Sequence, residues 1–280
     1  MQTERNRVAA RALVALATMA AGLVVGCGAG DAVEPAVVRA EAPLGRGSLR
    51  CEVRLVGEAP DAPLIVADKN VEHCGAELRD PVLRVQGGRI ADAVVSVDPG
   101  EQVAAGEALH LDLRSAGCLL EPRVQTAPVG SRLLLTNRDN ITHNPHGWLD
   151  GERTVFNVTL VDEGVSLERT LRDAGVYRID CDTHSWMRAF IHVFDHPFHG
   201  VTGSEGEVRI DGLPAGPREV VIWHEVLGSR RIQVQIEPGR ETAVVVEFEA
   251  IDTRSVELTP PGMEPWIARM DPLELQEDHN

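Results

Sequence analysis

The chain has 280 residues, with 43 acidic side chains against 27 lysines and arginines and a formal net charge of −16 at pH 7. Phosphate backbones and anionic headgroups repel such a surface, which argues against nucleic acid and anionic lipid as partners. The length is enough for one large domain or two small ones.

The chain opens with three arginines followed by an apolar stretch, 12–25, that is too short to span a bilayer. This order is typical of a secretory signal. Residues 23–27 (LVVGC) resemble a bacterial lipobox. The resemblance implies a lipoprotein signal over 1–27, lipidation of Cys27, export, and anchorage to a membrane facing the periplasm. Gly28 favours an outer membrane where there is one, and a plain secretory signal cut nearby is the alternative.

Two segments lack the periodicity of helix or strand. Residues 28–47 are rich in Ala, Gly and Pro, so we expect a flexible tether between the lipid and the folded part. Residues 251–280 contain prolines and an excess of acidic side chains, so we expect an irregular acidic tail.

Between the tether and the tail, short alternating apolar runs are separated by Gly, Pro, Asp and Asn, a pattern typical of strands. The runs lie at 49–56, 93–97, 132–136, 175–179, 190–194, 208–210, 219–223, 232–236 and 242–248. Only part of 101–114 carries an apolar face with a helical period. The sequence therefore predicts an all-β fold of the sandwich type.

The last third of this β part contains GVTGSEGEVRIDGLPAGPREVVIW, starting at Gly200. This run resembles the signature of carboxypeptidase-regulatory-like modules, which are related in shape to transthyretin; Arg218 stands near the place where that family usually has Tyr. The resemblance implies a β-sandwich region over 200–250. We expect a further β region over 48–100, either separate or part of the same sandwich.

A cluster of metal-ligating residue types lies between the strands 175–179 and 190–194. Cys181, His184 and Met187 form a C-x2-H-x2-M loop there, and His143 lies 38 residues before Cys181, in an N-x-D-x3-H-N segment after the strand 132–136. A thiolate, two imidazoles and a distant thioether suit both oxidation states of copper. The sequence therefore predicts a mononuclear copper site.

Over about 118–195 these two motifs resemble the cupredoxins, particularly the amicyanin and pseudoazurin type. The resemblance implies a Greek-key sandwich over 101–199 and one type 1 copper per chain, bound by His143, Cys181, His184 and Met187. By the same analogy Asn144 hydrogen-bonds across to the cysteine loop. A degenerate site with Cys181 buried or disulfide-bonded is the alternative.

The other histidines and the tryptophans have less specific roles in the sequence. His146 is an alternative ligand, three residues after His143, and His224 is interpreted as an exposed loop residue. A second metal site among His196, His199 and His224 is a further alternative. Trp186, beside Met187, is expected to pack around the site.

Five cysteines occupy a chain destined for an oxidising compartment, where thiols are paired, lipidated or metal-bound. With Cys27 assigned to lipid and Cys181 to copper, three remain for one pair. Cys51 lies in an alternating run as a core residue, whereas Cys74 and Cys118 lie beside glycines, so a Cys74–Cys118 bridge is preferred. Bridges from Cys51 to either of them fit the arithmetic equally well.

These features predict a copper-binding or one-electron-transfer protein with an unidentified redox partner. No enzyme is expected, because the chain has no H-x-H pairs, His-Cys-His run, G-x-S-x-G or H-E-x-x-H. The alternative is a carbohydrate- or protein-binding sandwich with a vestigial copper segment, in which Trp148, Trp186 and Trp223 supply aromatic platforms.

Overall fold

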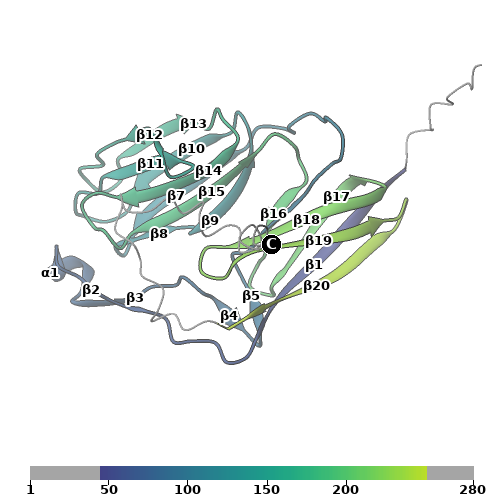
Figure 1. The fold of residues 1–280 in the computed structure, drawn as a ribbon. Helices are drawn as coiled ribbons and strands as arrows, with labels where there is room; N and C mark the ends of the chain where they lie inside the picture. Colours follow the sequence, from purple (N-terminus) through teal and green to yellow (C-terminus); the bar gives the residue numbers. More distant parts are fainter. Residues whose placement is uncertain (1–44, 251–280) are drawn as a thin grey trace, which may run out of the picture. The chain divides into compact units, whose positions relative to one another are not determined.

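The computed structural model describes residues 45–250. Cys27, the tether up to residue 44 and the tail 251–280 lie outside the described residues. Within 45–250 the chain forms twenty strands and one short helix, α1 (Val71–Cys74), which confirms the all-β prediction (Figure 1). No helix in this range is long and apolar enough to cross a membrane.

The middle of the chain forms a β-sandwich, here called the central sandwich. Its first sheet has the order β13 (Ser166–Thr170), β10 (Arg132–Asn137), β7 (His110–Ala116) and β8 (Leu119–Glu121). Its second sheet has the order β12 (Arg153–Asn157), β11 (Pro145–Leu149), β14 (Gly175–Cys181), β15 (Arg188–Phe194) and β9 (Val124–Pro128). Alternation fixes which face is buried, since Leu133 and Leu135 of β10 enter the core while Leu134 is exposed.

Strands from both ends of the described chain form a second sandwich, here called the flanking sandwich. One sheet has β17 (Glu207–Pro214), β1 (Arg46–Val56), β5 (Arg89–Ile90) and β4 (Val85–Gln86), with β20 (Glu241–Glu249) parallel to β1. The other has β16 (His199–Val201), β6 (Val94–Val97), β18 (Gly216–His224) and β19 (Gly228–Ile236). The expected β regions 48–100 and 200–250 thus supply strands to one sandwich, and the central sandwich lies between them in sequence.

Strand β15 has both faces covered, which explains its nearly continuous apolar run. Ile191 and Val193 enter the core of the central sandwich. Phe190 joins a separate cluster with Val94, Val124 and Trp223, which combines strands of both sandwiches. A strand buried on both faces loses the apolar–polar alternation of a half-exposed strand.

The range 48–100 is divided by the structure. Its segment 64–79 forms a hairpin of β2 (Leu64–Val66) and β3 (Glu77–Arg79) with α1 at its tip, and Ile65, Ala67 and Cys74 join the core of the central sandwich. The helical period within 101–114 was misleading, because residues 110–116 form strand β7 and residues 102–109 form no helix.

Candidate metal centre

The loop that joins β14 to β15 carries three of the four proposed ligands. It closes on itself: the Met187 N–H donates to the His184 carbonyl at 3.0 Å, and the Cys181 N–H donates to the Met187 carbonyl at 3.2 Å. Because β14 and β15 are paired neighbours, this short loop brings all three side chains to one end of the sandwich. Met187 is fully buried in the central core.

The fourth residue, His143, comes from the segment that links β10 to β11. The Asn137 carboxamide oxygen accepts the Asp139 N–H at 2.9 Å, while its amide nitrogen donates to the Ile141 and Leu160 carbonyls. An Asx turn of this kind fixes the path of the loop without regular structure. His143 then pairs with Leu160 through two backbone hydrogen bonds, which hold its side chain against the cysteine loop.

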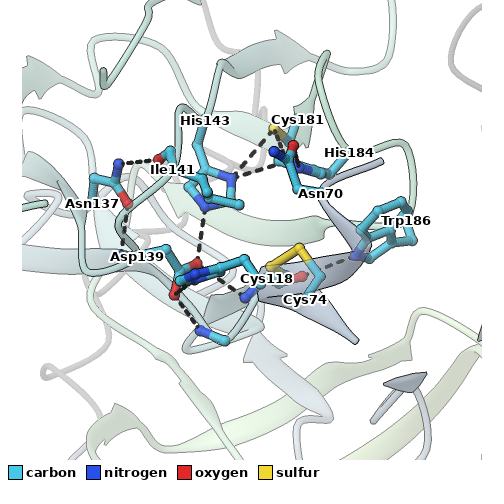
Figure 2. The surroundings of a disulfide bond; sticks show 12 residues. Asn70, Cys74, Cys118, Asn137, Asp139, Ile141, His143, Cys181, His184 and Trp186 are labelled. Carbon is cyan, nitrogen blue, oxygen red and sulfur yellow. Dashed lines mark hydrogen bonds and ion pairs between the residues drawn. A yellow bond between two sulfur atoms is a disulfide. The ribbon is translucent and has the colours of Figure 1, made fainter. Parts of the chain in front are cut away.

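Three donor atoms converge in the interior. The Cys181 Sγ lies 3.9 Å from the His143 Nδ1 and 3.8 Å from the His184 Nδ1, and the two Nδ1 atoms are 3.1 Å apart (Figure 2). Three donors placed trigonally around one metal, with bonds of about 2.0–2.3 Å, are separated by about 3.5–3.7 Å. The observed sides differ by at most about 0.4 Å from those of such a trigonal site. The triangle is therefore close to that of a metal site with two nitrogens and one sulfur, and the donor set suits copper.

The outward nitrogen of each imidazole has its own acceptor. His143 Nε2 donates to Asp139 Oδ2 at 2.9 Å, and His184 Nε2 donates to Asn70 Oδ1 at 3.0 Å (Figure 2). These bonds place the ring proton on Nε2 and leave both Nδ1 lone pairs facing Cys181. Neither acceptor was assigned a role from the sequence.

Burial keeps both imidazoles neutral. It lowers the pKa of His143, against the opposing effect of Asp139, and together with the His143 and Lys69 charges it lowers the pKa of His184 to about 4. Burial also raises the pKa of the Cys181 thiol, although backbone N–H groups oppose this. A cation bound here would therefore meet two free lone pairs and displace one thiol proton.

Asn144 bridges the two ligand segments, but through its backbone. Its N–H donates to Cys181 Sγ at 3.3 Å, and its carbonyl accepts the Asp182 N–H at 3.0 Å. Its side-chain amide donates instead to Val158 and Thr159. The expected hydrogen bonding to the cysteine loop is therefore made by the backbone of Asn144, while its side chain binds the segment of Val158 and Thr159.

Cys74 and Cys118 form a disulfide, so the structure contains the pairing preferred above from three alternatives. Cys51 is a free, buried thiol in the core of the flanking sandwich. Two N–H groups beside the bridge, those of Gly117 and Cys118, donate to the Asp139 carboxylate at 2.7 and 3.0 Å. Burial alone would raise the pKa of Asp139, but these donors and His143 hold it below the ordinary value.

Among residues 45–250, two groups of His, Cys, Asp and Glu converge closely enough to share a cation. One is His143, Cys181 and His184; the other is His73, Cys118 and Asp139, whose sulfur is committed to the disulfide. Neither group contains His196, His199 or His224, so the alternative second metal site is not formed there.

Two other histidine interpretations change. His146 does not join the donor triangle; its ring hydrogen-bonds Asp182 and Thr154 and stacks on Trp148. His224 is 1% exposed at the end of β18, so the expectation of an exposed loop residue was wrong. The residue lies in a β-strand whose inner face packs on the core.

Two of the three tryptophans named above, Trp186 and Trp223, are buried. Trp186 is 9% exposed and Trp223 is 6% exposed. Trp186 packs beside His184 and donates its indole N–H to the Cys118 carbonyl at 2.9 Å, as a wall of the site. The alternative of sugar stacking on these residues therefore loses two of its three aromatic rings.

No family model and no curated protein matches the chain. Among solved structures, a copper-containing nitrite reductase from Thermus scotoductus matches with a TM-score of 0.29 and 23% identity, over 34% of this chain and only 25% of that one. A purple cupredoxin from Nitrosopumilus maritimus matches with a TM-score of 0.27 and 23% identity, over 30% of this chain and 99% of that one. Amicyanin from Paracoccus versutus matches with a TM-score of 0.28 and 20% identity, over 36% of this chain and 97% of that one.

The chain thus spans about a quarter of the nitrite reductase it matches. With identities and TM-scores this low, the likenesses do not bear on function. The function proposed below rests on the geometry of the donor triangle.

Proposed function

We propose that the central sandwich binds one type 1 copper ion through His143, Cys181 and His184, with Met187 as a weak axial ligand, and serves one-electron transfer. The converging triangle of two Nδ1 atoms and one Sγ carries the proposal. Bound copper would supply a reversible one-electron couple at this position. The role is that of a carrier or copper-binding protein and not of an enzyme.

The surrounding residues hold the donors still and exclude water. His143, His184 and Met187 are fully buried, and Cys181 is 1% exposed. Each imidazole is anchored at its outward nitrogen, and the sulfur accepts a backbone N–H. Donors fixed in this way move little when the charge of a bound ion changes, which favours fast electron exchange.

Substitution of the thiolate donor tests the proposal. Wild-type protein loaded with Cu(II) should bind one copper per chain and show an intense visible band from thiolate-to-copper charge transfer. Cys181→Ala should lose the band and most of the affinity. Absorption spectra and metal analysis of the purified proteins provide both measurements.

Cys51 provides a matched control, because it is the other free and buried cysteine and lies in the other core. Cys51 belongs to neither group of converging donor side chains among residues 45–250, so it should bind no copper. Cys51→Ala should therefore keep the full band. A wild type that loads copper without colour, or a band that survives in Cys181→Ala, rules the assignment out.

Export and lipid anchorage complete the proposal, with a redox protein facing the periplasm as partner. The signal-like N-terminal residues and their resemblance to a lipobox support export, and a disulfide suits an oxidising compartment. Wild-type protein should fractionate with membranes, and Cys27→Ser should appear in the soluble periplasm. Wild type found wholly in the soluble fraction contradicts lipidation.

A further inference from the structure

A segment distant in sequence covers the outward side of His184. Residues 67–75, here called the cover, form the tip of the β2–β3 hairpin and include α1. Asn70 in the cover lies 114 residues before His184 and accepts its Nε2–H at 3.0 Å. With Trp186 packed beside the same ring, the His184 side chain has no exposed surface.

The Cys74–Cys118 disulfide fastens the cover to the central sandwich. Cys74 ends α1, and the Cys74 N–H donates to the Asn70 carbonyl at 2.8 Å, so Asn70 is one helical turn from the bridge. On the other side of the bridge, the Cys118 carbonyl accepts the Trp186 indole N–H. Two neighbours of the His184 ring, Asn70 and Trp186, are therefore tied to one disulfide (Figure 2).

Asn70 makes this contact from a backbone conformation that is unfavourable for most residues. Its φ is 49° and its ψ is 37°, in the left-handed region, where residues other than glycine are uncommon. Asn tolerates this region better than most, and strained positions of this kind concentrate at functional sites. Its side chain makes no helix-capping hydrogen bond and is used on His184 instead.

We propose that Asn70 is a positioning residue for the copper ligand His184, and that the disulfide-held cover retains the metal by closing the outward side of that ligand. This inference rests on the proposed copper function. Asn70 fixes the ring orientation and keeps the proton on Nε2, so that Nδ1 points at the metal. The disulfide limits how far the cover moves away from the ring.

Asn70→Gly is the most direct test, because glycine adopts the left-handed conformation freely and only the amide is removed. Copper-loaded protein is reduced to Cu(I) and mixed with excess bicinchoninate, and the rate of copper transfer is followed by absorbance. We expect Asn70→Gly to release copper about 10-fold faster or more, the scale typical of lost contacts to a ligand. Glu72→Gln, an exposed change in the same segment, should release it at the wild-type rate.

Two further measurements separate positioning from general loosening. The His184 Nε2–H should give a slowly exchanging imidazole proton resonance in the Cu(I) protein, which Asn70→Gly removes. Asn70→Asp retains an acceptor oxygen and a left-handed preference, so it should restore slow release. Equal release rates for wild type and Asn70→Gly overturn the inference, while colour and one copper per chain in both proteins keep the proposed function intact.

A double-mutant cycle tests the part played by the disulfide. Cys74→Ala/Cys118→Ala should also speed copper release, and adding Asn70→Gly to it should change the rate little, because the cover has already left the ring. If the combined variant speeds copper release by the product of the two separate increases, Asn70 acts independently of the disulfide. That result would overturn the proposal that the disulfide holds the cover in place. The single Asn70→Gly variant keeps the bridge and stays informative if the cysteine variants do not fold.

Discussion

At the scale of single residues, Met187 is the proposed axial ligand, which would tune the copper couple. It ends the ligand loop, its backbone closes that loop on Cys181 and His184, and its side chain is fully buried in the central core. A thioether is a weak, long axial ligand whose strength shifts the balance between Cu(I) and Cu(II). In the proposed site the visible band would arise from the Cys181 thiolate, so it should not depend on Met187.

Met187→Leu should therefore keep the visible band and raise the reduction potential. Removal of the axial donor would take more stabilisation from bound Cu(II) than from bound Cu(I). Leucine is close in volume, so the core should lose less than about 1.5 kcal/mol. Met187→Gln offers an oxygen donor to the same position and should lower the potential. Voltammetry of the three proteins checks both signs, and a common potential for all three would show that position 187 is not axial.

Asp139 shows how one carboxylate organises several segments. Its carboxylate accepts hydrogen bonds from the N–H groups of Gly117 and Cys118 and from the Nε2–H of His143. The His73 Nε2 lies 3.5 Å from its Oδ1. The N-x-D-x3-H-N pattern contains this residue four positions before the ligand. The spacing was therefore visible in the sequence, but the contacts that define its role come from α1 and from the turn between β7 and β8.

At the scale of elements, the β2–β3 hairpin is attached to the central sandwich by a covalent bond at its tip. The bridge joins the end of α1 to the turn between β7 and β8 and closes a loop of 44 residues. A loop of this length lowers the entropy of the unfolded chain by an amount worth about 4 kcal/mol at 25 °C in the chain-entropy model. The bridge therefore contributes to stability as well as to the position of the cover.

Cys74→Ala/Cys118→Ala should lower the free energy of unfolding by about that amount, measured by urea denaturation of metal-free protein. Cys51→Ala provides the comparison, since it removes a buried thiol and no bridge. Peptide mapping without reductant should recover the Cys74 peptide linked to the Cys118 peptide. A linked peptide containing Cys51 or Cys181 would contradict the pairing.

At the scale of the whole molecule, the two sandwiches share buried contacts. Trp223 of β18 packs on Phe190 and His192 of β15, with ring centroids 5.2 and 4.3 Å apart. Arg123, which precedes β9, is buried and hydrogen-bonds Asp80 and Glu225. His192 and His224 are both buried in this region, and neither has a hydrogen-bond partner at its Nε2.

Acid should weaken the fold through these two histidines. Burial, together with the His199 charge for His192 and the Arg123 charge for His224, lowers both pKa values to about 3. The unfolded chain titrates near pH 6.5, so below that pH it binds protons that the folded state excludes. Stability is therefore retained above about pH 6.5 and falls towards pH 3, by roughly 2 kcal/mol for each histidine at pH 5.

Urea denaturation of the metal-free protein at pH 7 and pH 5 measures this loss. His192→Phe removes one of the two titrating imidazoles and keeps an aromatic ring against Trp223. The free energy of unfolding of this variant should therefore fall less between pH 7 and pH 5 than that of the wild type, by roughly 2 kcal/mol. His110→Gln, at an exposed position of β7, should behave like wild type. Equal stability of the wild type at both pH values would contradict the prediction.

Local patterns in the sequence determined the strands and pointed to the proposed ligand residues. All nine predicted strand segments overlap strands of the structure, because alternation reflects which face of a strand is buried. The C-x2-H-x2-M loop was also recognisable from a local pattern, since three of the four proposed donors lie within seven consecutive residues. His143 was identified by its position after a predicted strand.

Tertiary structure alone decided what surrounds these residues. Asn70 and His184 meet across 114 residues, and nothing in either local sequence specifies that contact. The same holds for the division of 48–100 between two sandwiches and for the burial of His224. Periodicity records how a segment faces the interior, whereas the partner on the other side is set by the packing of the whole chain. At this site that packing supplies Asn70, the anchor of His184.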